Sequence, residues 1–153
     1  MADVFSKNKR SKIMAAVRSS GNKKTEKFIE RLFRRNGIVG WRRQLSLPGK
    51  PDFAFRQGRL ALFVDGCFWH GCSKHCRIPV SNHNYWLQKI ARNCARDKDV
   101  ARQLRGGGWR VLRFWEHDLS NESRLLTRLA RVLAKYDPSP GRQPRKSNAN
   151  AGK

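Results

Sequence analysis

Acidic residues are scarce in this sequence. Asp and Glu contribute 11 residues and Lys and Arg contribute 34, so the 153 residues carry a formal net charge of +23. The basic residues are spread from Lys7 to Lys153 rather than held in one block. A fold with this much positive charge repels itself and is expected to have a polyanionic partner, with nucleic acid as the first candidate and an anionic membrane surface as the second.

Long hydrophobic runs are absent. No apolar run approaches the roughly 20 residues that a membrane-spanning helix needs, and the N-terminal residues MADVFSKNKRSK lack the apolar core of a signal peptide. We therefore expect a soluble, intracellular protein with no membrane partner. Cysteine is also rare. In a cytosolic protein its four residues favour metal ligands or reduced core thiols over disulfides.

The length of the chain predicts one domain with one core. Hydrophobic spacing predicts helices over residues 11–17, 23–35, 85–104 and from a cap at Ser120 to Tyr136. Strands are predicted within 38–47, over 52–55 and 59–64 as a hairpin, and over 109–115. This order predicts a three-layer α/β domain over residues 1–136, with a mixed β-sheet flanked by helices. Residues 1–10 are expected to form a mobile basic arm and residues 137–153 a disordered basic tail.

Thiols and imidazoles gather in one segment after the second hairpin strand. Cys67, Cys72, His75 and Cys76 form a C-x4-C-x2-H-C pattern, which is typical of a tetrahedral structural zinc site. His117 follows a predicted neighbouring strand and is the best distant candidate for a further ligand. The neighbours His75 and Cys76 are not both expected to reach one ion. The alternative is that these residues are unpaired loop groups and small core thiols, which is the interpretation we favour for the isolated Cys94.

Two carboxylates stand at the ends of the predicted hairpin. Asp52 begins its first strand and Asp65 follows its second, so the two side chains are expected to lie within reach of a shared divalent cation. His70 is close enough to serve as a general base or acid. Glu26, in the first turn of a predicted helix, either complements the helix dipole or reaches into the site. The alternative is that Pro-Asp and Asp-Gly only form turns, but the basic background favours a nuclease.

Several longer motifs resemble one known family, the very-short-patch-repair (Vsr) DNA mismatch endonucleases. They are RSKIMAAVRSSGNKKTEK over 10–27, PDF over 51–53, VDGCFWHGC over 64–72, YWLQKIARNCARD over 85–97 and GWRVLRFWEH over 108–117. The likeness runs in order from about residue 3 to Tyr136. It implies a restriction-endonuclease-like fold with a structural Zn²⁺, and Mg²⁺-dependent nicking of double-stranded DNA 5′ to the thymine of a T:G mismatch, which arises from deaminated 5-methylcytosine.

The resemblance also implies roles for single residues. Asp52 and the carbonyl of Val64 would bind Mg²⁺, His70 would be the catalytic histidine, and Glu26 a supporting acid. Phe68, Trp69 and Trp86 would wedge into the duplex beside the mismatch, where opening the stack costs least; the alternative for these aromatic residues is core packing. Zinc would fall to Cys67, Cys72, His117 and one of His75 or Cys76.

Two positions depart from the family pattern. Asp65 stands where the best-known member has histidine, and His117 replaces a cysteine ligand. A monomer in the bacterial cytoplasm, associated with the nucleoid through DNA and open to contacts with other repair proteins, is the expected setting. The competing hypotheses are a restriction-type nuclease of the same fold that cuts both strands, and a non-catalytic, zinc-stabilised DNA-binding module.

Overall fold

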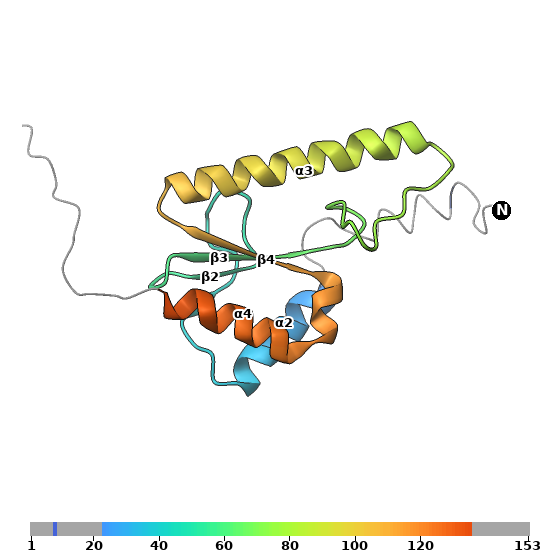
Figure 1. Cartoon of the computed structure of the whole chain (residues 1–153). Coiled ribbons are helices and arrows are strands. Elements are labelled where there is room, and N and C mark those ends of the chain that lie inside the picture. Colours follow the sequence, from blue (N-terminus) through green and yellow to red (C-terminus); the bar gives the residue numbers. More distant parts are fainter. Residues whose placement is uncertain (1–7, 9–22, 136–153) are drawn as a thin grey trace, which may run out of the picture.

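A four-stranded mixed sheet forms the middle layer of the protein (Figure 1). The structure, a computed structural model, describes Asn8 and residues 23–135. The predicted helix over 11–17, Tyr136, the tail and all of the N-terminal arm except Asn8 therefore lie outside the described residues. The strands are β1 (Trp41–Arg42), β2 (Phe53–Phe55), β3 (Leu60–Asp65) and β4 (Arg110–Trp115), and they stand in this order in the sheet.

Helices cover both faces of the sheet. Helix α2 (Lys23–Arg35) and helix α4 (Glu122–Ala134) lie on one face and α3 (His83–Gly106) lies on the other, while a 3-10 helix, η1 (Glu116–Ser120), connects β4 to α4 (Figure 1). The mixed α/β fold with a flanked mixed sheet is thus confirmed. The more specific restriction-endonuclease-like fold stays a prediction. No helix among residues 23–135 has both the length and the apolar composition required to cross a membrane.

Strand β3, with the sequence LALFVD, has a neighbouring strand on each side. Its side chains are apolar on both faces of the sheet except for Asp65, which is paired with Arg113. It pairs antiparallel with β2, with Phe53 opposite Leu62, and parallel with β4, with Leu62 opposite Leu112. Parallel neighbours need a crossover, which here consists of the loop over 66–82 and α3. The predicted hairpin is confirmed. The register of the parallel β3–β4 pair places Asp65 opposite Trp115 at the end of the sheet.

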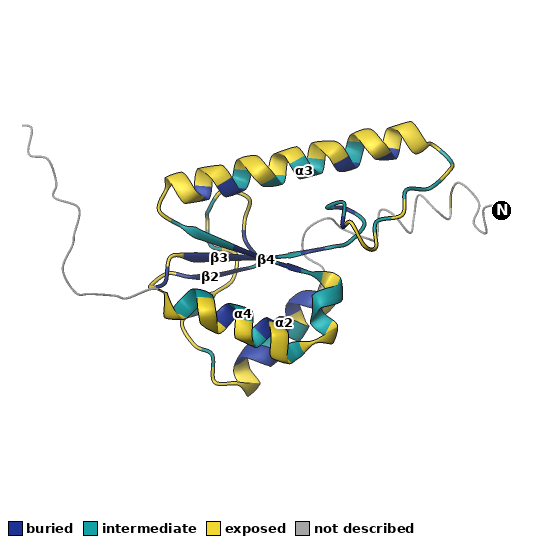
Figure 2. Ribbon diagram, viewed as in Figure 1, coloured by how far each residue is buried: buried dark blue, intermediate teal, exposed yellow. Residues whose placement is uncertain are grey.

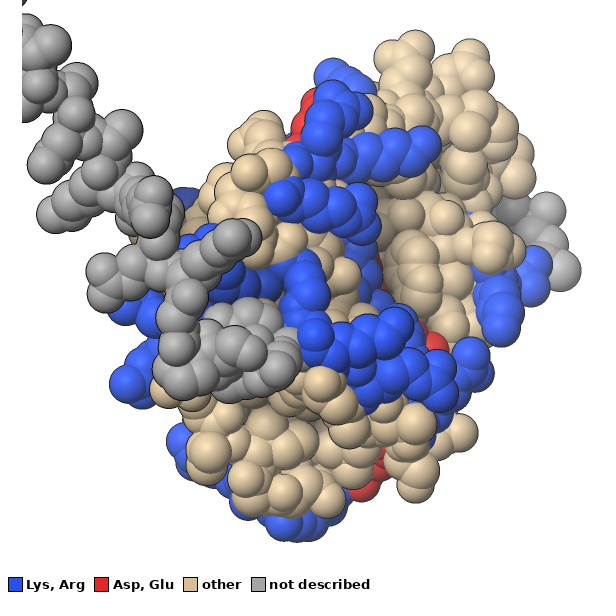
Figure 3. Space-filling model, turned by 60° about the vertical axis from the view of Figure 1, so that its left-hand side comes forward, with Lys and Arg blue, Asp and Glu red and all other residues tan. Residues whose placement is uncertain are grey.

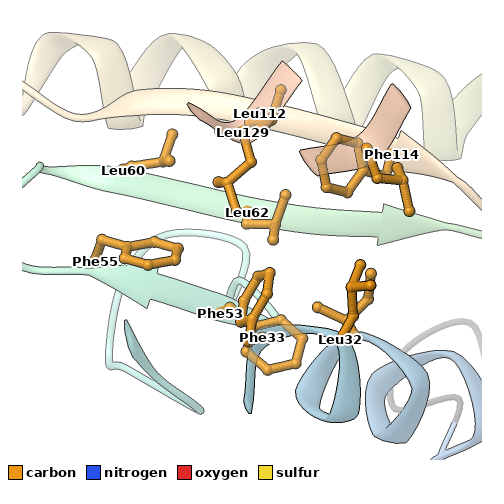
Figure 4. Packing of buried hydrophobic residues seen from close by; sticks show 11 residues of the cluster. Leu32, Phe33, Phe53, Phe55, Leu60, Leu62, Leu112, Phe114 and Leu129 are labelled. Carbon is orange, nitrogen blue, oxygen red and sulfur yellow. The ribbon is translucent and has the colours of Figure 1, made fainter. Parts of the chain in front are cut away.

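Alternate residues of β3 feed two separate cores. Leu60 and Leu62 pack with the aromatic residues of β2 and with α2 and α4, as Figure 4 shows, whereas Ala61 and Phe63 pack with Leu104 of α3. Helix α3 accordingly buries only a narrow stripe and exposes most of its surface (Figure 2). Asp65 continues the Ala61 and Phe63 face, so its side chain belongs to the side of the sheet that α3 covers.

Some predicted boundaries need correction. Helix α2 has the predicted bounds, but the predicted strand within 38–47 is reduced to Trp41–Arg42. Ser120 does not cap the last helix: the N-cap is Asn121, whose side chain accepts a hydrogen bond from the backbone N–H of Arg124 at 3.1 Å. The Ser120 hydroxyl donates instead to the carbonyl of His117.

Candidate active site and metal centre

The two predicted carboxylates meet at the end of the hairpin. The backbone N–H of Val64 donates to Oδ2 of Asp52 at 2.8 Å, which fixes this carboxylate beside the last residues of β3. Asp65 is only 5% exposed. Both of its oxygens accept from Nη1 of Arg113, at 2.9 and 2.8 Å, so Asp65 already has a cationic partner.

The environment of Asp52 opposes its ionisation. Burial raises the pKa of this carboxyl and the nearby charge of Asp65 adds to the effect, whereas the Val64 hydrogen bond and the charges of Arg43 and His70 lower it; the net pKa is raised. A cation bound at Asp52 would counter this, because an adjacent positive charge favours the ionised form. The same contributions show that Asp52, Asp65 and His70 act on one another electrostatically.

His70 is held by an acid from α3. Its Nδ1 lies 2.5 Å from Oδ2 of Asp97 and 3.9 Å from Oδ1 of Asp65. Burial alone would lower the pKa of His70, but the hydrogen bond to Asp97 and the charges of the two acids raise it above its ordinary value. The pKa of Asp97 is lowered: burial would raise it, but His70 and Arg113 outweigh that effect.

Helix α3 holds the backbone around His70 as well as its ring. The Asn93 side chain donates to the carbonyl of Trp69 at 3.0 Å, and the Cys94 thiol donates to the carbonyl of His70 at 3.4 Å. Gly71 has a φ of +65°, in the left-handed region, and a Cβ there would lie 3.1 Å from Ile90 and 3.2 Å from the Cys94 sulfur. Only glycine allows this close approach of the loop to the helix.

Asp97 and Arg113 were not identified from the sequence as site residues, although both lie within the quoted motifs. Asn93, Cys94 and Asp97 share one face of a helix by their spacing, and this face is the signal that sequence reasoning missed. Arg113 could be found only from the sheet register, which pairs it with Phe63 and so makes it a diagonal neighbour of Asp65 across the parallel pair of β3 and β4.

Glu26 is connected to the Asp52 carboxylate through Arg43. It is 8% exposed and forms an ion pair with Arg43, the residue whose charge also lowers the pKa of Asp52. Glu26 is thus connected to the surroundings of Asp52 through Arg43, and it also lies in the first turn of α2, so both interpretations of this residue stay predictions.

Four of the five predicted zinc ligands lie together. The ligand atoms of Cys67, Cys72, His75 and His117 are all within 4.8 Å of one another. Nδ1 of His117 is 3.2 Å from the Cys67 sulfur and 3.7 Å from the Cys72 sulfur. The fifth, Cys76, is directed elsewhere, since its thiol donates to the carbonyl of Phe68.

These distances suit a tetrahedral ion. Zn–S bonds of about 2.3 Å and Zn–N bonds of about 2.0 Å at tetrahedral angles separate sulfur from nitrogen by roughly 3.6 Å. The Cys72 sulfur is 3.8 Å from Nδ1 of His75, and the hydrogen bond from the Cys72 N–H to the Cys67 carbonyl brings the two thiols together. Burial, together with the nearby Cys72, raises the pKa of the Cys67 thiol, which a bound cation would reverse. The donor set thus fits zinc.

The three predicted wedge residues form one aromatic cluster. The ring centroids of Phe68, Trp69 and Trp86 lie 5.3 to 6.0 Å apart in tilted and edge-on pairs. Trp69 and Trp86 are each 9% exposed, so they form the packed base of the cluster, and Phe68 is the more exposed member. Lys89 lies over both indole rings, which places a positive charge beside the cluster.

Comparison with known proteins gives consistent matches. The family model for the DNA mismatch endonuclease Vsr matches residues 2–77, a segment that includes Asp52, His70 and three of the four clustered metal-ligand residues. The type II nicking enzyme V.XorIIP of Xanthomonas oryzae pv. oryzae is 41% identical over 145 residues, which is 91% of this chain and all of the relative. The type II nicking enzyme V.NaeI of Lentzea aerocolonigenes is 40% identical over 117 residues, 71% of this chain and 68% of the relative. The DNA mismatch endonuclease Vsr of Escherichia coli is 38% identical over 128 residues, 82% of this chain and 80% of the relative.

Proposed function

This chain belongs to the family of the DNA mismatch endonuclease Vsr, and we propose that it nicks one strand of duplex DNA 5′ to the thymine of a T:G mismatch, with Mg²⁺ as cofactor. As a family member it is a DNA endonuclease, a hydrolase of phosphodiester bonds. The observation that carries the finer proposal is the grouping of Asp52, Val64 and the His70–Asp97 pair at one end of the sheet.

Asp52 and the backbone carbonyl of Val64 are the proposed Mg²⁺ ligands. Both offer oxygen, the atom that Mg²⁺ prefers, and the hydrogen bond between the two residues keeps them adjacent. When bound, the cation supplies charge stabilisation at the scissile phosphate and activates a water molecule. The protein contributes the position of the ligands, which belong to β3 and to the residue directly before β2.

His70 is the proposed proton acceptor or donor. An ionised Asp97 carboxylate can accept a hydrogen bond but cannot donate one, so it favours the His70 tautomer that carries its proton on Nδ1. Nε2 is then left to exchange a proton with water or with the leaving group. Asp65 is proposed to act within this group through Arg113 and His70, since both of its oxygens bind Arg113. Glu26 is proposed to act through Arg43 in the same way.

A structural Zn²⁺ is proposed at Cys67, Cys72, His75 and His117, with Cys76 outside the ligand set. Two of these ligands flank the segment that carries His70. Zinc would therefore order the segment from both sides, in a stretch with few buried apolar side chains.

Phe68, Trp69 and Trp86 are proposed as the wedge that enters the duplex. The buried pair of indole rings would support Phe68 against the force of unstacking, and a mismatched step requires the least energy to open. One asymmetric lesion needs one active site, so we propose a monomer with a restriction-endonuclease-like fold that acts on nucleoid DNA in the cytoplasm.

A nicking assay tests the function. The substrates are an end-labelled duplex with one T:G pair and an identical duplex with T:A, each with Mg²⁺ and with Mg²⁺ chelated. We expect one nick, only in the T:G duplex and only with Mg²⁺. Cleavage of both strands in both duplexes would instead identify a restriction-type nuclease.

The variant Asp52→Ala separates binding from catalysis. It is expected to bind the T:G duplex with nearly unchanged affinity and to lose nicking. Binding without nicking by the unmodified protein, under every metal condition tried, would favour a non-catalytic DNA-binding module. Normal nicking by the variant would show that the metal ligand is another residue.

A further inference from the structure

An arginine-lined cavity begins at Arg43, beside the proposed catalytic group, and extends away from it. Its volume is about 660 Å³, and it opens between the segment after β1, the β2–β3 turn and the start of β4. It is lined by four arginines and no acidic residue: the lining residues are Arg42, Arg43, Gln44, Leu45, Ser46, Leu47, Arg56, Arg59 and Trp109. The end of the molecule with the β2–β3 turn faces forward in Figure 3, where Lys and Arg side chains gather around a hollow and few acidic atoms are visible.

The arginines of the cavity differ in their partners. Arg43 pairs with Glu26 and Glu30, and Arg59 donates to the carbonyl of Gly107. Arg42 and Arg56 are exposed, and neither side chain forms a hydrogen bond or an ion pair with another described residue. Two guanidinium groups without a protein counter-charge at one cavity point to an anionic ligand with several acceptor oxygens.

The cavity extends from the active site towards the far end of the sheet. Arg43 lies at the catalytic end, where its charge acts on Asp52, and Arg56 lies in the turn at the opposite end of β2 and β3. Five residue steps separate Leu60 from Asp65 in β3, which is roughly 17 Å at about 3.3 Å per residue. One strand of B-DNA has one phosphate per about 3.4 Å of axis, so for a duplex whose axis runs parallel to β3 this length corresponds to roughly five phosphates.

We propose that this cavity binds the sugar–phosphate backbone of the substrate duplex about five nucleotides from the cleaved bond. The inference rests on the proposed function, because it takes the duplex at the catalytic group as its starting point. Phosphate contacts of this kind position the duplex without reading its bases. They should therefore strengthen the binding of mismatched and paired DNA alike and leave the chemical step unchanged.

The test compares two double variants of the full chain that each remove two positive charges. The cavity variant is Arg42→Gln with Arg56→Gln. The control is Arg124→Gln with Arg131→Gln, two exposed residues of α4 that do not line the cavity. Thermal melting of both variants within about 2 °C of the unmodified protein shows that neither change disturbs the fold.

Binding to the T:G and T:A duplexes is measured from 0.05 to 0.3 M salt. For the cavity variant we expect the slope of log K against log salt to decrease in magnitude by about 2, equally for both duplexes, because about 0.9 ion is released per phosphate contact. The control should leave the slope unchanged within about 0.5. The single-turnover nicking rate at saturating protein should be the same for all three proteins.

Neutral methylphosphonate linkages locate the contact. Placed four to six nucleotides from the scissile bond, they should weaken binding by the unmodified protein and have little further effect on the cavity variant. Equal slopes for the two variants, or an equal response to every methylphosphonate position, would overturn the proposal. If the unmodified protein nicks no DNA, the proposed function fails instead, and the slope comparison still decides whether the cavity binds phosphates.

Discussion

The Asp65–Arg113 ion pair offers a direct energetic test of the site geometry. Replacing Arg113 with Met keeps an unbranched apolar stem against the ring of Phe63, which the guanidinium now covers at 4.5 Å. It leaves Asp65, which is 5% exposed, without the donor that binds both its oxygens, and it removes a cation 3.8 Å from Asp97. Removing one partner of a buried pair costs about 3–5 kcal/mol.

The expected loss for Arg113→Met is smaller than that range, because the Arg113 side chain is 25% exposed. We expect about 2–3 kcal/mol, a large part of a total stability of roughly 5–15 kcal/mol. In the double variant Asp65→Asn with Arg113→Met no carboxylate is left unpaired at position 65. Its cost should fall below the sum of the two single costs by about 1–2 kcal/mol.

Urea unfolding at one fixed zinc concentration measures these differences. The control is Arg102→Met, which breaks an ion pair with Asp99 in which the side chains are 79% and 58% exposed. Such exposed pairs contribute at most about 1 kcal/mol, and we expect a change below about 0.5 kcal/mol. Additivity of the Asp65 and Arg113 costs within about 0.5 kcal/mol would refute the argument that the pair is an energetic unit.

Three further predictions concern acid stability, metal content and capping. Asp97 has a folded pKa below its ordinary value of 3.8, so its ionised form stabilises the fold above that pH and this contribution is lost as the pH falls through the folded pKa. Asp97→Asn should therefore melt earlier than the unmodified protein at pH 7, and the gap should close below pH 3.8; a constant gap would contradict this. Elemental analysis should find close to one zinc per chain in Cys76→Ser and much less in His117→Ala, and equal loss in both would show that Cys76 is a ligand. In urea unfolding, Asn121→Ala should lower the free energy of unfolding by about 1 kcal/mol, and Ser120→Ala should lower it much less. A larger effect of Ser120→Ala would show that Ser120 is the N-cap.

The sequence predicts the fold well where apolar side chains follow one clear period. The stripe of α2 gives both of its ends, and the run over 60–64 identifies the central strand because only a strand buried on both faces is apolar at every position. The cap of α4 was assigned to the wrong residue because Ser120 and Asn121 are adjacent and both are good N-cap residues. Residue preference alone cannot choose between these two N-cap candidates. Ser120 is taken up as the last residue of η1, which leaves Asn121 as the N-cap of α4.

The contacts of the candidate site also divide into those that the sequence predicts and those that it does not. Cys67 and Cys72 are close in sequence, and a hairpin brings Asp52 next to β3, so local spacing and one pairing suffice to group them. Spacing could not choose between His75 and Cys76, because the direction of each side chain depends on the turns of the loop. Arg113 is 48 residues from its partner Asp65, and this contact follows only from the parallel register.

The segment around His70 is positioned by two separate sets of contacts, and these explain how a loop with few buried apolar residues can hold the proposed catalytic histidine. On one side, the clustered ligands Cys67 and Cys72 flank the segment. On the other side, Asn93 and Asp97 of α3 bind its backbone and its ring, each through polar contacts that need no apolar burial. Loss of the proposed metal alone would therefore release the ends of the segment but leave the contacts to α3, whereas a change in α3 would free the imidazole while the Cys/His cluster stays intact. Because Leu104 anchors α3 against β3, the position of His70 also depends on the packing of this helix on the sheet.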